Sequence, residues 1–190
     1  MPYKLKFFVL LATSSTLIAC TTPNPQTDAS SMTESATESQ VKDWDSVSLR
    51  LSRGICFGAC PSYIVEIKGD GTVNYCGRNF VKDIGTREDS IAEEDVQTLF
   101  NRFVEADFEA LDDSYKARVS DLPSYKLRMA YDDTVKTVVD YGGRMIDMPP
   151  VVKKLQQAVD DTAQTDKWIG EPGEKQRVNE IVECEAKLAF

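Results

Sequence analysis

Apolar and polar residues alternate along five short stretches of the chain, which is the pattern of strands with one buried face. The first strand is expected at 47–51, where Val47, Leu49 and Leu51 are separated by polar residues. Turn signals rich in Gly and Asp group the other four strands into two hairpins. We expect these hairpins at 63–77 and 125–141.

The first hairpin has a register that its own apolar residues determine. For the apolar side chains of both strands to share one face, Ile67 must oppose Val73 across the turn at 69–71. This register requires a three-residue loop, and it predicts that Gly71 adopts the left-handed conformation.

Two segments carry apolar residues at the spacing of a helix with one buried side. In the first, Ser90 and Glu93 have the spacing of a capping box, and the helix should end near Asp107. The second helix begins at Pro150. Residues 109–123, between the first helix and the second hairpin, are expected to form a loop. The apolar sides comprise Val96, Leu99, Phe100, Phe103 and Val104 in the first helix and Val151, Val152, Leu155 and Val159 in the second.

These elements predict an α+β fold, an antiparallel sheet built from two β-hairpins with two helices packed on one face. Apolar residues make up 42% of the chain, enough for a folded core. We expect this domain at 44–170, followed by a C-terminal tail at 171–190 that is weakly helical.

The start of the chain has the features of an export signal. Lys4 and Lys6 precede an apolar run that is too short to span a membrane comfortably. The run ends in Leu-Ile-Ala followed by Cys20, which resembles the lipobox of bacterial lipoproteins. The resemblance implies a signal peptide at 1–19, removed before Cys20, and acyl chains on Cys20 that hold the mature protein on a membrane.

Residues 20–43 are expected to comprise the lipidated cysteine and a disordered tether. The tether is inferred because these residues are rich in Ser, Thr and Glu and have no periodic apolar face. Thr21 stands where Asp marks inner-membrane retention in well-studied lipoproteins. We therefore expect a lipid-anchored protein of the bacterial cell envelope, on the outer membrane facing the periplasm.

Composition excludes several classes of function. The formal charge of −9 falls to −11 when residues 1–19 are removed with Lys4 and Lys6, so nucleic acid is not an expected partner. The chain has no histidine, which excludes Ser-His-Asp and Cys-His nucleophiles and two-histidine zinc sites. We expect no metal and no cofactor.

Residues 54–63 read Gly-Ile-Cys-Phe-Gly-Ala-Cys-Pro-Ser-Tyr and lead into a Gly-Asp-Gly-Thr-Val turn at 69–73. This segment resembles an uncharacterised bacterial family, a domain of unknown function, with a Gly-x-Cys-Phe/Tyr-Gly-x-Cys-Pro-x-Tyr motif. Trp168 and Ile169 look like the close of that domain, and the resemblance covers roughly residues 45–170. It implies an exported, often lipid-anchored domain and supplies no established activity.

Cys56 and Cys60 are close in sequence and lie in a loop, which makes a structural disulfide in an oxidising compartment the favoured interpretation. A thiol-disulfide redox centre is the alternative. Such centres of the thioredoxin kind have two intervening residues at a helix N-terminus, whereas three residues intervene here. Two thiols without histidine are too few ligands for a metal site.

The hairpin register also assigns the remaining cysteines. Cys76 should oppose Ile64 on the outer face, while Cys60 should oppose Phe80, four residues further along. Four residues of strand span about 13 Å, beyond the roughly 7 Å limit for a disulfide. Cys76 is therefore expected to pair with Cys184, which would bring the tail over the outer face of the first hairpin.

Other polar and aromatic residues have ordinary structural interpretations. Three pairs of adjacent acids are more typical of turns or solvated faces than of acid–base dyads. They are Asp112-Asp113, Asp132-Asp133 and Asp160-Asp161. Tyrosines at alternate strand positions either line a ligand groove or, as we favour, are half-buried core residues. They are Tyr63, Tyr75, Tyr125, Tyr131 and Tyr141.

The sequence therefore favours a non-catalytic envelope lipoprotein. Its partners would be the membrane, through acyl chains on Cys20, and an unknown envelope protein or small ligand. The leading alternative is a periplasmic thiol-disulfide redox protein that uses Cys56 and Cys60. A hydrolase running on carboxylates alone is a third possibility, which requires two acidic side chains converging in one pocket.

Overall fold

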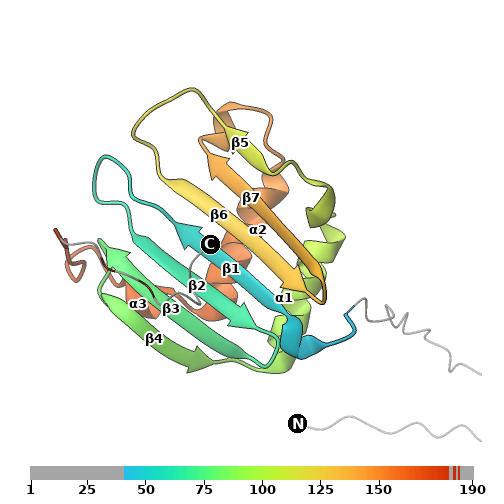
Figure 1. The fold of residues 1–190 in the computed structure, drawn as a ribbon. Helices are drawn as coiled ribbons and strands as arrows, with labels where there is room; N and C mark the ends of the chain where they lie inside the picture. Colours follow the sequence, from blue (N-terminus) through green and yellow to red (C-terminus); the bar gives the residue numbers. More distant parts are fainter. Residues whose placement is uncertain (1–40, 180–181, 183, 185–190) are drawn as a thin grey trace, which may run out of the picture. The chain divides into compact units, whose positions relative to one another are not determined.

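The computed structural model describes residues 41–179, 182 and 184. The expected signal peptide at 1–19, Cys20 and most of the tether at 20–43 lie outside these residues. Within the described part of the chain, seven strands form one sheet (Figure 1). The strands are β1 (Ser48–Arg53), β2 (Ser62–Lys68), β3 (Thr72–Asn79), β4 (Gly85–Ser90), β5 (Ser114–Lys116), β6 (Ser124–Tyr131) and β7 (Thr134–Tyr141).

Helices cover one face of this sheet (Figure 1). The two long ones pack their apolar sides on the strands, and none of the described helices is long and apolar enough to cross a membrane. They are α1 (Glu93–Glu105), α2 (Pro150–Ala163) and the short α3 (Asp166–Ile169). Single 3-10 turns are η1 (Trp44–Ser46), η2 (Phe108–Ala110) and η3 (Gly143–Met145).

The sheet has the order β4-β3-β2-β1-β6-β7-β5. Its pairs are antiparallel except β5 and β7, which run parallel. The prediction of mixed helix and strand content is confirmed. The prediction that the sheet consists of two hairpins and is wholly antiparallel is wrong. Strands β4 and β5 were missed because β4 is an exposed edge strand without an apolar face, and β5 has three residues within the expected loop at 109–123.

The register of the first hairpin is confirmed from Tyr63 to the turn. It shifts by one residue at Ser62, which pairs with Asn79, and β2 begins at Ser62, so the expected pairing of Cys60 with Phe80 is wrong. Ile67 opposes Val73, Ile64 opposes Cys76, and the loop between β2 and β3 has three residues. Gly71 has a φ of +82°, in the left-handed region that was expected. The apolar alternation therefore determined which face each residue of this hairpin occupies.

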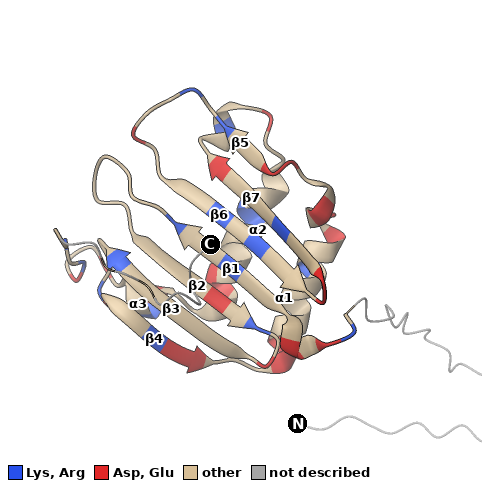
Figure 2. Cartoon of the chain, in the orientation of Figure 1, with Lys and Arg blue, Asp and Glu red and all other residues tan. Residues whose placement is uncertain are grey.

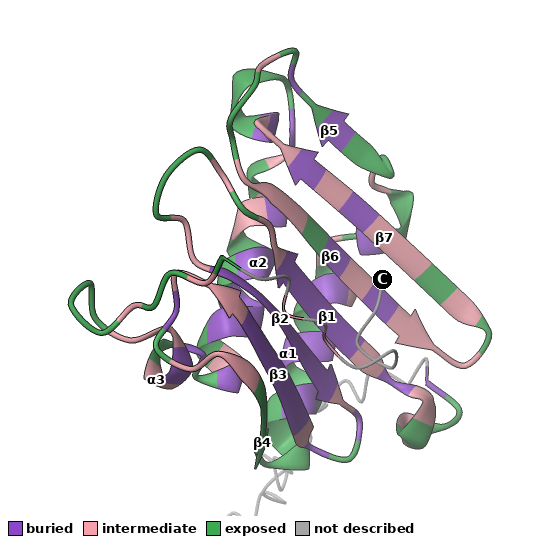
Figure 3. Ribbon diagram, turned by 60° about the vertical axis from the view of Figure 1, so that its left-hand side comes forward, coloured by how far each residue is buried: buried purple, intermediate pink, exposed green. Residues whose placement is uncertain are grey.

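The core lies between the sheet and the helices, and strands β1, β2 and β3 are its most deeply buried part (Figure 3). Tyr63 and Tyr75 are fully buried there, and Tyr75 stacks on Trp168 of α3 with 4.8 Å between ring centroids. The capping box predicted at Ser90 is wrong, because Ser90 is the last residue of β4 and Ala92 is the N-cap of α1.

The tail beyond Glu171 passes the end of β3 and then reaches the outer face of the sheet. Gln176 forms an isolated bridge with Val81, so the described residues 171–179 are not helical as expected. Asn79 donates its side-chain amide to the carbonyl of Val178 at 2.9 Å. Val182 and Cys184 then pack against Ile64 and Cys76 on the outer face.

Candidate functional site

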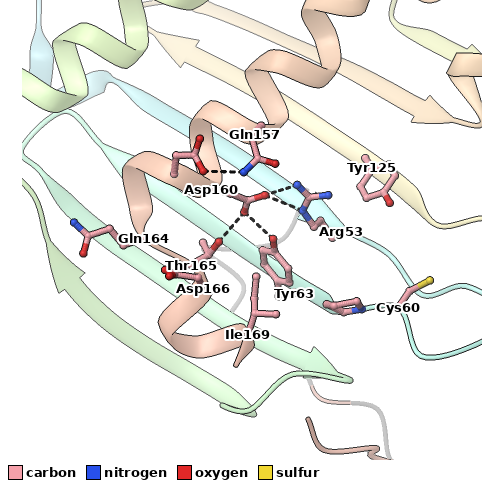
Figure 4. A pocket seen from close by; sticks show the side chains of 12 residues that line it. Arg53, Cys60, Tyr63, Tyr125, Gln157, Asp160, Gln164, Thr165, Asp166 and Ile169 are labelled. Carbon is pink, nitrogen blue, oxygen red and sulfur yellow. Dashed lines mark hydrogen bonds and ion pairs between the residues drawn. The ribbon is translucent and has the colours of Figure 1, made fainter. Parts of the chain in front are cut away.

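A cleft opens where β1 ends and β2 and β6 begin, beneath α2 (Figure 4). The register places three side chains in a row across these strands, because Arg53 of β1 opposes both Tyr63 of β2 and Tyr125 of β6. Asp160 projects from α2 onto this row. The cleft is therefore built by strand pairing between segments that are distant in the sequence.

Asp160 is the centre of the polar network in the cleft. Its carboxylate is 8% exposed, and one oxygen accepts hydrogen bonds from the Tyr63 hydroxyl at 2.7 Å and the Thr165 hydroxyl at 3.0 Å. The other oxygen accepts from Nε of Arg53 at 3.0 Å and from Nη2 of the same guanidinium. Both oxygens are thus occupied by neighbours that hold the carboxylate in one orientation.

The environment of this network shifts the pKa of its members. Burial raises the pKa of Tyr63 far above its ordinary value, and the negative charge of Asp160 raises it further. Burial lowers the pKa of Arg53, but the nearby Tyr63 and Asp160 outweigh this effect and leave it raised. Tyr63 is therefore a neutral donor and Arg53 a permanent cation at neutral pH.

The cleft has two hollows, of about 580 and 540 Å³, which share Arg53 and Gln157. The first also contains Asp161 and Asp166, so we call it the acidic hollow. The second contains Arg144 and Lys153, so we call it the basic hollow.

A second buried carboxylate supports the basic hollow from behind. Asp140 is 1% exposed, and it binds Nζ of Lys153 at 2.7 Å, the Gln156 amide at 3.1 Å and the Gly143 backbone amide at 2.9 Å. Burial raises the pKa of Asp140, but these hydrogen bonds outweigh burial and hold it below its ordinary value.

Tyr125 lines the acidic hollow and contacts two cations that line the basic hollow. The Arg53 guanidinium carbon is 5.0 Å from its ring centroid, and the Lys153 ammonium nitrogen is 4.0 Å away. Each of these cations is also bound to a buried carboxylate, Arg53 to Asp160 and Lys153 to Asp140. The aromatic ring and the carboxylates together hold two like charges close to one another.

The disulfide loop borders the acidic hollow. Cys56 and Cys60 are bonded, with 5.7 Å between their Cα atoms, and Cys60 lines the hollow. The Gly54 amide donates to the carbonyl of Ser124 at 2.7 Å, which ties this loop to the start of β6. Phe57, at the tip of the loop, is 89% exposed.

The structure separates the residues that the sequence singled out. The second disulfide joins Cys76 to Cys184, the pair expected from the register, and it lies on the outer face. Only Cys60 among the cysteines lines the cleft, while Cys20 lies outside the described residues. Of the tyrosines, Tyr63 and Tyr125 line the cleft. Tyr63 is also buried, so both interpretations, a residue of a ligand groove and a residue of the core, apply to it.

The interpretation of Asp160 as a turn or solvated residue is wrong. It lies in α2 and is buried, eight residues after Val152 and four after Gln156, on the same side of the helix. This helical spacing was a sequence signal for burial that the adjacency of the two acids obscured. Asp161 is exposed, as expected, and accepts from the Gln157 amide at 2.7 Å.

Among the described residues, no group of three or more Cys, Asp or Glu side chains is arranged to hold a metal ion. Asp160 and Asp161 both line the acidic hollow, but the Asp160 carboxylate is held by Arg53, Tyr63 and Thr165. A carboxylate in this state accepts no further proton without breaking the network.

Residues 47–163 match the model of a family described as a domain of unknown function, DUF6438. This chain belongs to the DUF6438 family. The DUF6438 match begins next to β1 and ends at the last residue of α2, so Trp168 and Ile169, expected at the close of the domain, lie beyond it. Thr165 and Cys184 lie beyond it as well. A search of curated proteins finds no match to the chain.

Proposed function

We propose that this protein is a lipid-anchored bacterial envelope lipoprotein whose domain binds a ligand in the cleft without catalysing a reaction. Acyl chains on Cys20 hold it on the outer membrane, facing the periplasm, and the residues that follow act as a tether. The DUF6438 domain carries the binding site. Its ligand is a small molecule or a segment of another envelope component.

The observation that carries this proposal is the fixed polar lining of the cleft. Arg53 and Lys153 are each held by a buried carboxylate and by the Tyr125 ring before any ligand arrives. Preorganised charges lower the entropy cost of binding. Asp160, the buried carboxylate of the acidic hollow, is saturated with hydrogen bonds, which favours a positioning role over acid–base chemistry.

The anchor is tested by replacing Cys20 with Ser. Only cysteine supplies the sulfur that receives the lipid, so the Cys20→Ser protein should move from the membrane fraction to the soluble fraction. It should also lose incorporation of a labelled fatty acid. Continued sedimentation of this variant with membranes would overturn the proposed anchoring.

Binding is tested with the mature protein and the small-molecule fraction of a periplasmic extract. Backbone amide NMR shifts should change at Arg53, Tyr125 and Gln157. Gln157→Trp should abolish these changes, because Gln157 is exposed and lies between both hollows. Gln97→Trp on the exposed side of α1 is the matched control and should leave them intact. Shift changes confined to surfaces outside the cleft would refute the assignment of the site.

A second candidate function is thiol-disulfide exchange by Cys56 and Cys60. The observation that favours it is that Cys60 lines the acidic hollow, where a substrate thiol could approach. Thiol trapping of protein extracted without reductant separates the two functions. A fully oxidised pair supports a structural bond, whereas a mixture of oxidised and reduced protein supports redox work.

A further inference from the structure

The cleft has opposite charges at its two ends. Acidic and basic residues are spread over the sheet and the helices (Figure 2). The basic hollow has no carboxylate among its lining residues, although the chain as a whole has a formal charge of −9. Arg144 is exposed there and makes no ion pair with another described residue. It is therefore a cation available to a ligand, next to Lys153 and Arg53, which are already oriented.

The fold adds to the positive potential of the basic hollow. Pro150, the first residue of α2, lines this hollow, and no side chain caps that end of the helix. The positive end of the helix dipole therefore lies beside the same space as Arg144. The unpaired guanidinium of Arg144 and the helix end therefore favour an anionic group here. Lys153 and Arg53, whose charges are balanced by Asp140 and Asp160, add oriented hydrogen-bond donors.

The acidic hollow has the opposite preference. Asp161 and Asp166 are exposed and make no ion pair with another residue in the described part of the chain. The charge of Asp160 is already balanced by Arg53. The C-terminal end of α2 lies beside these carboxylates and adds its negative dipole end, so this hollow selects a cationic group.

The charge order along α2 is the reverse of the order that stabilises a helix. Lys153 and Lys154 lie in its first five positions and Asp160 and Asp161 in its last four. Cations near the N-terminus and anions near the C-terminus oppose the dipole. Ion pairs with Asp140 and Arg53 offset this cost for Lys153 and Asp160. The exposed Asp161 has no ion pair with another described residue, so its charge is open to a cationic ligand.

We infer that the cleft takes a short zwitterionic peptide, with its free carboxylate in the basic hollow and its free amine in the acidic hollow. This inference rests on the proposed binding function. Lys153 and Asp161 are eight residues apart on α2, or about 12 Å along the helix axis. An extended peptide rises about 3.3 Å per residue, so three to four residues span the two charged ends. Tyr125, Pro61 and Ile169 offer apolar contacts in the acidic hollow.

The test is affinity selection from tetrapeptide libraries with the mature protein, read out by mass spectrometry. One library has free termini, one is amidated at the carboxyl end and one is acetylated at the amino end. Peptides with free termini should be retained, and each cap should reduce retention about tenfold, the loss expected for one charge-assisted contact.

Arg144→Gln locates the carboxylate. It should weaken binding of the selected free peptide about tenfold and should not weaken its amidated form further, because the contact is already lost. Arg118→Gln is the matched control, since Arg118 is exposed and does not line either hollow. Asp161→Asn should weaken the free peptide and leave the acetylated form unchanged by the same reasoning.

Retention of capped and free peptides to the same extent would overturn the zwitterion assignment. Failure to retain any peptide would overturn it as well. If the extract experiment still shows a ligand in the cleft, the proposed binding function stands and the ligand class is wrong. If neither experiment shows a ligand in the cleft, both proposals fail.

Discussion

Replacing Asp160 with Asn tests whether the polar network of the cleft is the structural support described above. The substitution keeps the size and shape of the side chain and removes its charge. The amide oxygen can still accept from Tyr63 and Thr165. Its NH2 group, however, would face the Arg53 guanidinium, and two donors cannot bond to each other.

The expected loss follows from the burial of the pair. Breaking one partner of a buried ion pair costs about 3–5 kcal/mol because the other charge is left uncompensated. The Arg53 side chain is 20% exposed and keeps some contact with water, so the lower end, about 3 kcal/mol, applies. This is a large part of the 5–15 kcal/mol that stabilises a typical domain.

Urea unfolding followed by tryptophan fluorescence measures this loss. Trp168 is a suitable probe because it lies in α3, which directly follows Thr165 in the chain. With an m-value of about 1–3 kcal/mol/M, the midpoint should fall by roughly 1–3 M. Asp161→Asn is the matched control, because Asp161 is exposed and adjacent, and it should change stability by about 0.5 kcal/mol or less. Coinciding midpoints for the two variants would refute the role assigned to Asp160.

Two further predictions concern stability. Replacing Cys76 and Cys184 with Ala should lower the free energy of unfolding by about 5 kcal/mol, and replacing Cys56 and Cys60 should lower it by about 2 kcal/mol, because the sequence separations are 108 and 4. Urea unfolding compares the two variants. A larger loss from opening the short loop would contradict the chain-entropy argument. The pKa of Asp140 is lower in the folded than in the unfolded state, so its stabilisation is complete above about pH 4 and is lost as the pH falls through the folded value. The stability of Asp140→Asn should therefore depend less on pH between 6 and 3, and an equally steep fall would show that another group is responsible.

Strand patterns were predictable where one face is buried and the turn is short. The alternation around Ile67 and Val73 identified the first hairpin and its register, and that register also assigned Cys76 to the outer face. Strand β4 gave no such signal, because all but one of its residues are exposed at the edge of the sheet. Apolar residues alternate in a strand when one of its faces is buried. An edge strand without a buried face therefore shows no such alternation in the sequence.

The cleft was less predictable than the elements that build it. Arg53 and Tyr125 are 72 positions apart, and they meet because β1 pairs with β6. Alternation shows that both segments are strands, but it does not show which strands are neighbours. Asp160 could have been assigned to the buried side of α2 from its spacing to Val152, whereas its partners could not.

The two ends of the cleft differ in how they relate to the DUF6438 domain. Arg144, Lys153 and the start of α2, which make the basic hollow, all lie within the matched residues 47–163. The acidic hollow is completed by Thr165, Asp166 and others beyond the match. This later segment is fixed to the fold by the stacking of Trp168 on Tyr75 and, further along, by the disulfide at Cys184. Recognition of an anionic group can therefore be built from the matched domain alone, whereas full recognition of an amine also requires the segment that follows it.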